Sequence, residues 1–567
     1  MPESPFVTPS EHVEIHLPDG RTLRGPRGAS LESILAPLAA LVPAPLVAAV
    51  VNGELSELTR PIKIESQVRP VSMAEADGAR IYRRSLVFLL QAAVARLFPT
   101  GALFVDHAMT SGGYFCHVRG LPPLNTADLT ALEAEMRRLV AKNVPFVRRD
   151  IPVSEAIEYF TKRGHQDKVR LLRHRIRPLI TLYDLEDYGD FPHGYLVPAT
   201  GYLKWFELAP MDSGFVLRYP RQHTPTLIPP PVESPKLLSS FRLYGDWLER
   251  LGIGAAGALA DAIVERRGRE IVLVSEALHE HHVSAIARQI ADRRDGARLV
   301  LISGPSSSGK TTFSRRLAVQ LLALGITPFA LELDHYFVER ENTPRDADGK
   351  LDYETIDALR LDQLAVNLAG LLAGDEVQLP RYSFQLGRQE PGAIVRLRPG
   401  QIILLEGIHG LNPRLVPPAL AGQSFKVYAS ALTQLNLDRH NRVSTTDTRL
   451  IRRIVRDARD RGYNAVDTIG RWESVRRGEK LHIFPHQENA DVMFNSALVY
   501  ELAALRPLAE PLLRQVPHGT PEHVEAVRLL SLLQWFAPID SEWIPDNSIL
   551  REFVGGSSLK DFKLWGG

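Results

Sequence analysis

The strongest constraint on the fold of this chain is a glycine-rich loop between an apolar segment and an amphipathic one. Residues 299–302 are the apolar run Leu-Val-Leu-Ile, which predicts a buried parallel strand. Residues 304–311, Gly-Pro-Ser-Ser-Ser-Gly-Lys-Thr, then match the pattern G-x-x-x-x-G-K-[ST] in full. Helical spacing follows, with four apolar residues expected to face inward: Phe313, Leu317, Leu321 and Leu324. This order predicts an α/β domain whose parallel sheet is flanked by helices.

The loop is suited to hold the phosphates of a nucleotide. Gly304 and Gly309 allow backbone angles that a side chain would forbid, so that backbone N–H groups can turn inward. The first turn of the helix adds unpaired N–H groups and partial positive charge. Lys310 is expected to reach the β- and γ-phosphates, and the Thr311 hydroxyl to ligate magnesium. The predicted nucleotide-binding residues are Gly304, Ser306, Ser307, Ser308, Gly309, Lys310, Thr311 and Thr312.

Length and composition place the chain among globular proteins with several domains. Its 567 residues are enough for about three or four domains, and its net charge of +1 gives no overall attraction to nucleic acid or membranes. A single cysteine, Cys116, excludes an internal disulfide framework, and we expect it to be a core thiol. Residues 1–5 do not resemble a signal peptide, and no apolar run reaches the length of a membrane span. We therefore expect a cytoplasmic protein without a membrane partner.

Two acidic residues follow predicted strands that come after the loop. The strand predicted over residues 328–333 ends at Asp334, and the strand predicted over residues 401–405 ends at Glu406. The carboxyl ends of parallel strands are where such sheets place their chemistry. Magnesium prefers oxygen ligands and keeps several waters, so Thr311 and Glu406 are the predicted metal ligands. Each acid alone could instead be a helix cap.

A basic helix is predicted over residues 449–457. Arg449, Arg452, Arg453 and Arg456 have the spacing i, i+3, i+4 and i+7, which places the guanidinium groups on one face. A solvated basic face is the usual explanation for such a run. We favour a lid that clamps phosphates, because phosphoryl transfer depends mainly on positioning and charge neutralisation. The chain lacks the Asn/Thr-Lys-x-Asp motif of GTP-binding switches, which favours a small-molecule kinase.

Taken together, these motifs resemble the uridine kinase branch of the phosphoribulokinase/uridine kinase family. The resemblance covers about residues 297–500, and the motifs that carry it are 304–312, Asp334-His335-Tyr336-Phe337, Asp352-Tyr353, Arg381-Tyr382-Ser383-Phe384, Glu406-Gly407-Ile408-His409-Gly410, 449–457, Arg461-Gly462 and Ala490-Asp491-Val492. It implies ATP and Mg²⁺ as cofactors. It also implies that Asp334 is the general base, with Lys310, Arg452 and Arg456 as further catalytic residues.

The same resemblance implies an acceptor site. Its predicted residues are Asp352, Tyr336, Tyr382, Phe384 and Arg449, with Asp352 on the ribose hydroxyls and the two aromatic residues Tyr382 and Phe384 beside the base. The chain departs from the family at Ser383 and Gly387, where uridine kinases usually have Asp and a base-reading His. Losing a base-edge donor changes discrimination by about 1–3 kcal/mol per hydrogen bond, so kinase chemistry is a firmer prediction than uridine specificity.

The N-terminal part of the chain resembles bacterial threonyl-tRNA synthetases over about 220 residues. Residues 17–20, 51–55, 82–90 and 111–115 follow one another as in the TGS and editing domains of that family. The metal- and water-holding His and Cys positions of the editing site are here Arg84, Phe88, Pro192 and Leu196. We therefore expect aminoacyl-tRNA hydrolysis to be absent. The N-terminal region is then expected to be a binding or regulatory module, or else a purely structural relic.

These observations predict an α/β P-loop kinase preceded by a β-grasp domain and an α+β domain. The expected domains are a TGS-like domain (1–73), an editing-like domain (74–223), a Pro-rich linker (224–236), a helical connector (237–296), a P-loop kinase (297–500) and a C-terminal helical extension (501–567) with Leu-rich helices over 496–514 and 521–535. Strands are also expected within residues 194–208. Residues 252–257 match G-x-G-x-x-G but follow a predicted helix, so we expect a turn between helices. His279 is expected on a polar helix face.

The predicted function is transfer of the ATP γ-phosphoryl group to the 5′-hydroxyl of a ribonucleoside, most simply uridine or cytidine. One alternative keeps the kinase and changes the acceptor to another sugar or a small alcohol. A second is an RNA-binding or sensing protein that uses ATP as a switch through its synthetase-like region. The expected partner is thus a nucleoside or other small molecule, and the sequence leaves nucleic-acid binding and homo-oligomer formation open.

Overall fold

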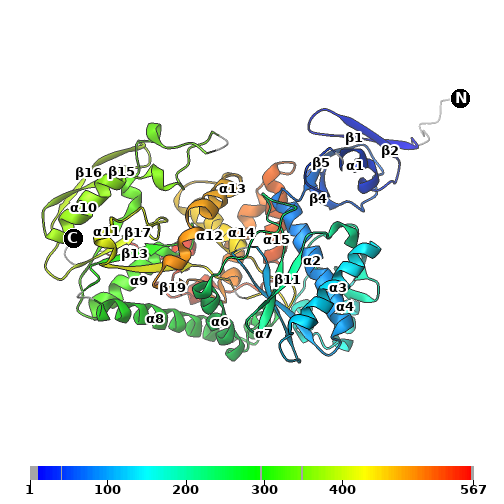
Figure 1. Cartoon of the computed structure of the whole chain (residues 1–567), viewed down its shortest axis with the longest axis horizontal. Coiled ribbons are helices and arrows are strands. Elements are labelled where there is room, and N and C mark those ends of the chain that lie inside the picture. Colours follow the sequence, from blue (N-terminus) through cyan, green and yellow to red (C-terminus); the bar gives the residue numbers. More distant parts are fainter. Residues whose placement is uncertain are drawn as a thin grey trace.

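The computed structural model describes residues 10–39, 41–110, 112–293, 296–346, 349–433 and 435–562. The signal-peptide expectation concerns residues outside these ranges. Figure 1 shows the N-terminal sheet at one end of the molecule, the α8–α10 region at the other, and the helices α12 to α15 between them. Among the described residues, no helix is both long and apolar enough to cross a membrane.

The N-terminal region forms a mixed five-stranded sheet with one helix across it, as a β-grasp fold requires. Its strand order is β2-β1-β5-β3-β4, with β1 and β5 parallel and the other pairs antiparallel. Alternation of apolar and polar residues in the first strand buries Val13 and Ile15 beneath the helix. The elements are β1 (His12–His16), β2 (Thr22–Pro26), α1 (Leu31–Ala39), β3 (Leu46–Val51), β4 (Glu54–Glu57) and β5 (Ser66–Ser72).

The following region has an α+β fold built on two antiparallel sheets, β10-β9-β8 and β11-β12-β7-β6. The long helix α2 is buried along most of its length and packs against both the β-grasp sheet and α3. The elements are α2 (Ala76–Leu97), β6 (Ala102–Ala108), β7 (Tyr114–Arg119), α3 (Thr126–Lys142), β8 (Val147–Pro152), α4 (Val153–Lys162), α5 (Gln166–Arg173), β9 (Leu179–Leu185), β10 (Tyr188–Asp190), the 3-10 turn η1 (Thr200–Tyr202), β11 (Glu207–Met211) and β12 (Gly214–Arg218).

Three helices connect this region to the next sheet: α6 (Pro235–Arg250), α7 (Ala256–Val264) and α8 (Gly268–Asp292). Residues 252–257 form the turn from α6 into α7, so they do not follow a strand as a dinucleotide fingerprint would. The prediction for His279 was wrong. Its side chain is 1% exposed and its Nε2 lies 3.0 Å from the carbonyl oxygen of Ala497, which makes it a core histidine.

A five-stranded, all-parallel sheet forms the core of the kinase-like part, in the order β14-β17-β13-β18-β19. The central strand is buried throughout, and successive residues face two different cores. Val300 and Ile302 pack with the α8/α9 side, whereas Leu299 and Leu301 pack with the α10 side. The sheet is therefore covered on both faces at its centre, which is why β13 is apolar over most of its length.

The elements of this part include a two-stranded hairpin, β15–β16, and two long helices that follow the sheet's fourth strand. They are β13 (Leu299–Ser303), α9 (Lys310–Ala323), β14 (Pro328–Glu332), η2 (Leu333–Tyr336), η3 (Arg340–Asn342), η4 (Ile356–Ala358), α10 (Leu361–Ala373), β15 (Val377–Ser383), β16 (Arg388–Val395), β17 (Ile402–Glu406), α11 (Pro418–Ala421), β18 (Ser424–Ser430), α12 (Thr445–Asp460), α13 (Ala465–His482), η5 (Phe484–Asn489) and β19 (Val492–Asn495).

The C-terminal part consists of α14 (Glu501–Arg514), α15 (Pro521–Leu533), the turn η6 (Ser541–Trp543) and the short helix α16 (Arg551–Val554). The first of these helices begins five residues later than predicted, because residues 496–500 lead from β19 into it. Two further predictions were wrong. Leu324 is 43% exposed because α9 ends one residue before it, and residues 194–206 hold a 3-10 turn with no strand.

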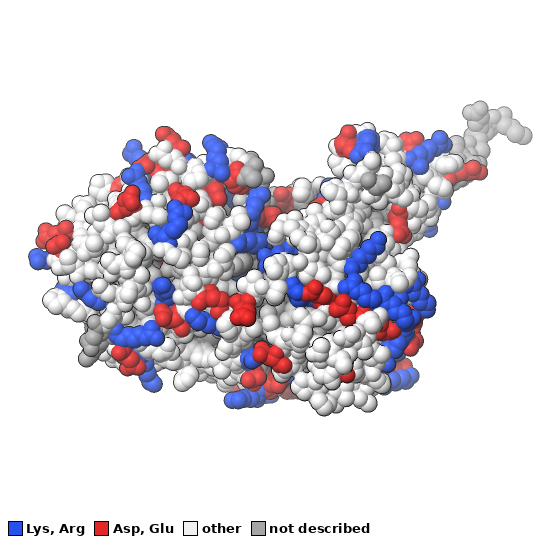
Figure 2. All heavy atoms as spheres, in the orientation of Figure 1, with Lys and Arg blue, Asp and Glu red and all other residues white. Residues whose placement is uncertain are grey.

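The sequence-based fold class is confirmed: a parallel P-loop sheet follows a β-grasp and an α+β region. The domain boundaries themselves stay a prediction. On the face shown in Figure 2, acidic and basic side chains are interspersed, in keeping with the near-zero net charge.

A loop of the kinase-like part, residues 436–443, enters the α+β region and meets a buried lysine there. Lys168 is fully buried, and its Nζ lies 3.0 Å from Asp190 and 3.1 Å from Asp438 of the loop. His440 Nδ1 lies 2.8 Å from the second oxygen of Asp190. Burial alone would lower the pKa of Lys168, but the carboxylates around it outweigh burial and raise it. The two parts are thus joined by a buried ionic cluster.

Candidate active site

The glycine-rich loop connects β13 to α9 and closes tightly around its own backbone. Ser307 and Gly309 have φ angles of 57° and 82°, the left-handed conformations that turn the loop. A Cβ on Gly304 would lie 1.9 Å from the carbonyl oxygen of Ala429, so only glycine can occupy this position. Lys310, the first residue of α9, is 8% exposed, and its Nζ donates to the carbonyl of Pro305 at 3.1 Å. The side chain thus lies folded over the loop.

Helix α12 braces this loop through its arginines. Arg449 donates to the Ser306 carbonyl at 2.8 Å and pairs with Glu479 of α13, which in turn accepts from the Ser306 backbone N–H at 2.9 Å. Arg453 donates to the Ser306 hydroxyl at 2.8 Å. The predicted basic face therefore exists, and it is turned toward the phosphate loop.

Arg452 lies deeper than the lid interpretation requires. It is fully buried, its Nε donates to Glu501 at 2.6 Å, and its Nη2 donates to the carbonyl of Ser496 at 2.8 Å. Arg449 is only 2% exposed and is also paired. In this arrangement the two arginines support the loop from beneath and have no free donor face for a phosphate or an acceptor. Of the two arginines predicted to contact phosphates, Arg452 and Arg456, the second is partly exposed. Its guanidinium pairs with Asp457 at 2.9 Å.

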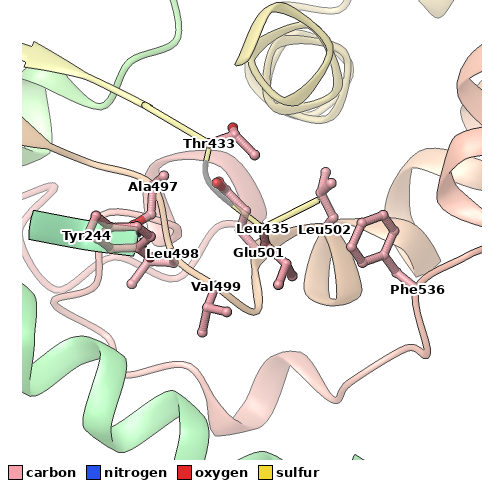
Figure 3. A pocket seen from close by; sticks show the side chains of 9 residues that line it. All are labelled: Tyr244, Thr433, Leu435, Ala497, Leu498, Val499, Glu501, Leu502 and Phe536. Atoms are coloured by element: carbon pink, nitrogen blue, oxygen red, sulfur yellow. Dashed lines mark hydrogen bonds between the residues drawn. The ribbon is translucent and has the colours of Figure 1, made fainter. Parts of the chain in front are cut away.

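Glu501, the partner of Arg452, also lines a small cavity of about 10 Å³, roughly the space of one water molecule. Figure 3 shows the side chains around it: Tyr244, Thr433, Leu435, Ala497, Leu498, Val499, Glu501, Leu502 and Phe536. The lining is mainly apolar, and the cavity is too small for a nucleotide or a sugar. It is a packing gap between α6, the start of α14 and the segments that follow β18 and β19.

Thr311 and Glu406 meet at the carboxyl edge of the sheet. The Thr311 hydroxyl donates to Glu406 Oε2 at 3.1 Å, which joins the first turn of α9 to the end of β17. The pKa of Glu406 is raised to about 7, chiefly by burial. The charge of Lys310 opposes this shift, and the neighbouring carboxylates of Asp334 and Glu332 contribute to it. A hydroxyl and a carboxylate oxygen at hydrogen-bonding distance are a donor set that suits Mg²⁺. Glu406 and Thr311 would hold that ion.

Asp334 lies just beyond β14, in the turn η2, where the residue keeps an exposed surface although protein atoms surround its carboxyl group. Desolvation by the surrounding protein raises its pKa, Glu332 raises it further, and Lys310 opposes the shift. Asp334 thus shares its electrostatic surroundings with Lys310 and Glu406. Strands β14, β17 and β13, which carry these three groups at or just beyond their ends, are neighbours in the sheet.

Glu354 belongs to none of the sequence motifs described above, and no local pattern indicated it as a site residue. Its Oε2 is buried without a hydrogen-bond partner among the described residues. Its pKa is raised to about 7, chiefly by burial and next by the charge of Glu479. Asp352 adds to this shift, and Arg453 and Lys310 oppose it. Gly478 of α13 packs directly on it, since a Cβ there would lie 2.2 Å from the Glu354 Cβ. A buried, unpaired carboxyl near Lys310 belongs to the same site.

Glu354→Gln is expected to make the protein more stable than the wild type above pH 7, by roughly 1–3 kcal/mol. A carboxyl whose folded pKa exceeds its unfolded value stabilises fully below the unfolded pKa and loses that contribution as pH rises through the folded pKa. The loss therefore falls between about pH 4.5 and 7. Urea unfolding at pH 5 and pH 8 measures it. A stability difference that does not change between the two pH values would contradict the assignment.

Four aromatic side chains gather on the acceptor side of the sheet. Tyr382, on β15, lies 5.1 Å from Phe384 and 5.7 Å from Phe337 between ring centroids, and Phe337 lies 5.6 Å from Tyr353. The Tyr382 hydroxyl is buried without a hydrogen-bond partner in the described part of the chain, whereas Phe384 is 55% exposed. These rings form one wall beside Asp352, whose Oδ1 accepts from the Glu354 N–H at 2.9 Å.

Tyr336 does not join this wall. It is fully buried in the α10 core, and its hydroxyl accepts from Asn367 at 3.1 Å, so a substrate contact is excluded in this conformation. Gly387, where the family has a base-reading His, has φ of 69°, and a Cβ there would lie 2.8 Å from Arg340. Arg340 fills the space and donates to the Phe384 carbonyl at 2.5 Å. A guanidinium thus stands where a histidine was expected.

The parallel sheet, the glycine-rich loop before α9 and the acidic residues at its edge define the catalytic part as a P-loop kinase domain. Residues 299–503 match the model of the Phosphoribulokinase / Uridine kinase family, so this part of the chain is similar to that family. The match ends three residues into α14 and leaves the other C-terminal residues without a counterpart.

The N-terminal region is similar to threonine–tRNA ligases. The relatives include those of Enterococcus faecalis (32% identical over 204 residues; 36% of this chain and 31% of the relative) and Bacillus subtilis (28% over 207 residues; 36% and 32%). The chain thus spans about a third of the length of these relatives.

Two solved structures are also similar to part of the chain. One is a "putative fructose transport system kinase" from Silicibacter sp. TM1040, with a TM-score of 0.28 and 19% identity, covering 37% of this chain and 98% of that one. The other is a "possible uridine kinase" from Bacillus stearothermophilus, with a TM-score of 0.24 and 18% identity, covering 36% and 100%.

Proposed function

We propose that the protein transfers the γ-phosphoryl group of ATP to a hydroxyl of a ribonucleoside, with uridine or cytidine as the first acceptors to test. The observation that carries the proposal is the shared electrostatic environment of Lys310, Asp334 and Glu406 at one edge of the parallel sheet. The aromatic wall of Tyr382 and Phe384 supports a flat base in the acceptor, and Asp352 supports a sugar diol beside it.

In the proposed reaction the loop amides and Lys310 hold the phosphate chain. Asp334 accepts the proton of the acceptor hydroxyl, whose oxygen forms the new bond to the γ-phosphorus as the bond to the leaving ADP oxygen breaks. Its raised pKa makes it a better proton acceptor than an ordinary aspartate near neutral pH. Magnesium, held by Thr311 and Glu406, would supply charge neutralisation on the phosphate oxygens. Arg456 is partly exposed, so it could add to that neutralisation.

A panel of nucleosides and phosphosugars tests the proposal. Each acceptor is incubated with ATP and Mg²⁺, and ADP release is compared with that of Lys310→Ala. We expect acceptor-dependent ADP release that the variant lacks. ADP release only with non-nucleoside acceptors would show that the acceptor is another sugar or a small alcohol. Arg340 beside Gly387 favours this alternative.

Phe384→Ala is expected to raise the acceptor KM by roughly 3- to 10-fold with kcat little changed, because one aromatic contact is worth about 0.5–1.5 kcal/mol. The ring is 55% exposed, so its removal should not disturb folding. Leu386→Ala is the matched control, since this residue of the same hairpin is 57% exposed. Equal KM values for both variants would remove Phe384 from the acceptor site.

A second candidate function is RNA binding through the synthetase-like region. Lys480, near the end of α13, is close enough to Arg83, Arg221 and Arg476 for their charges to act on it. Burial, followed by repulsion from Arg476, lowers the pKa of Lys480 to about 8. Such a group of cations suits a polyanion. Filter binding of tRNA over a salt series tests this candidate function, because protein–phosphate contacts weaken steeply as the salt concentration rises. No salt-dependent binding at low ionic strength would exclude this candidate.

A further inference from the structure

The C-terminal segment, residues 544–556, lies against the glycine-rich loop, although the family match ends at residue 503. Glu552 of α16 reaches the first turn of α9, where its Oε2 accepts from the Thr312 hydroxyl at 2.9 Å and from the Thr312 backbone N–H at 3.4 Å. The two residues are 240 positions apart in the chain.

The segment is held in place on both sides of Glu552. Phe553 is fully buried beneath the Arg452 guanidinium, 5.0 Å from its carbon to the ring centroid, and Arg459 donates to the carbonyls of Phe553 and Glu552 at 2.6 and 2.9 Å. Ile549 packs on the loop itself, since a Cβ on Gly309 would lie 2.5 Å from its Cγ2. The carboxylate is therefore positioned by a structured segment.

The position of Glu552 is one that a bound phosphate would use. The Thr312 N–H is one of the unpaired donors of the first turn of α9, and this end of the helix carries partial positive charge. A carboxylate that accepts from these donors replaces a phosphate oxygen with a protein oxygen. It also adds negative charge beside the path of the phosphate chain.

We propose that residues 544–556 form an internal competitor for the nucleotide, with Glu552 occupying donors of the phosphate site until the nucleotide displaces it. This inference rests on the proposed kinase function, whose nucleotide site it would regulate. The segment has to release Glu552 from Thr312 when the phosphates bind, and anything that holds the segment away should raise nucleotide affinity.

Glu552→Gln tests the proposal because it keeps the shape of the side chain and removes its charge. Calorimetric titration with Mg·ATP should give a Kd about tenfold lower than that of the wild type, as expected for removing a competing charge at a helix N-terminus. Glu542→Gln is the matched control, since Glu542 is an exposed acid in η6 of the same C-terminal part, and its Kd should equal that of the wild type.

Hydrogen exchange provides a readout that needs no variant. Mg·ATP added to the wild type should increase amide exchange over residues 549–556, as the segment leaves the loop. An unchanged or higher Kd in Glu552→Gln, or exchange that ATP slows or leaves unchanged, would overturn the inference while leaving the kinase intact. No ATP binding to either the wild type or Glu552→Gln would instead overturn the proposed function itself, and this inference with it.

Discussion

Asp334→Asn is expected to lower turnover by roughly 10²- to 10⁴-fold with little change in ATP affinity. The amide keeps the size of the side chain but cannot accept the proton of the acceptor hydroxyl. Asp334 lies at the carboxyl end of β14, where the residue keeps an exposed surface, and the raised pKa of its carboxyl suits a general base. ADP release at saturating acceptor measures turnover, and calorimetry measures the Kd for ATP.

Glu332→Gln is the control for this experiment. Glu332 is exposed on the same strand and contributes to the raised pKa of Asp334, so its removal should change turnover only a few-fold. Full turnover in Asp334→Asn would remove this residue from its role as general base. A loss of ATP affinity as large as the loss of turnover would indicate damage to the phosphate loop.

Lys168→Met is expected to have the largest effect on stability, about 3–5 kcal/mol. Removing this buried ammonium leaves Asp190 and Asp438, each 1% exposed, without their shared cation. Because Asp438 belongs to the loop that leads into α12, we also expect this loop to lose contacts with the α+β region. Urea unfolding, monitored by tryptophan fluorescence, measures the change in the free energy of unfolding.

Lys162→Met is the matched control, because Lys162 is 73% exposed and pairs only with Glu158, four residues earlier on the same helix. Its loss should cost less than about 0.5 kcal/mol. Combining Lys168→Met with Asp190→Asn and Asp438→Asn should restore much of the stability, since no buried charge of the cluster is then left unpaired. Equal effects of Lys168→Met and Lys162→Met would contradict the ionic cluster.

Local patterns were sufficient to predict the parts of the site that are local in sequence. The glycine-rich loop is defined by eight consecutive residues, and the apolar runs before Asp334 and Glu406 are short strands. The spacing of the arginines on α12 also correctly placed them on one face. These features depend on backbone geometry and periodicity, which a sequence shows directly.

Contacts between distant residues could not be predicted in the same way. Periodicity placed Arg449 and Arg452 on a common face, but their partners Glu479 and Glu501 lie 30 and 49 residues further on. Nothing in the local sequence showed that these acids would bury the two arginines beneath the loop. The same holds for Glu552 on Thr312. Leu324 was predicted from a periodicity that continued past the end of its helix.

The most direct test of the account follows the γ-phosphoryl group itself. ATP labelled at the γ-phosphate is incubated with Mg²⁺, the acceptor selected by the panel and the full-length chain, and the products are separated. We predict label in a phosphate ester of the acceptor hydroxyl, and none in that product with Lys310→Ala or Asp334→Asn. Label that appears only as inorganic phosphate, or that stays in ATP with every acceptor tested, would contradict the assignment of this site as a kinase.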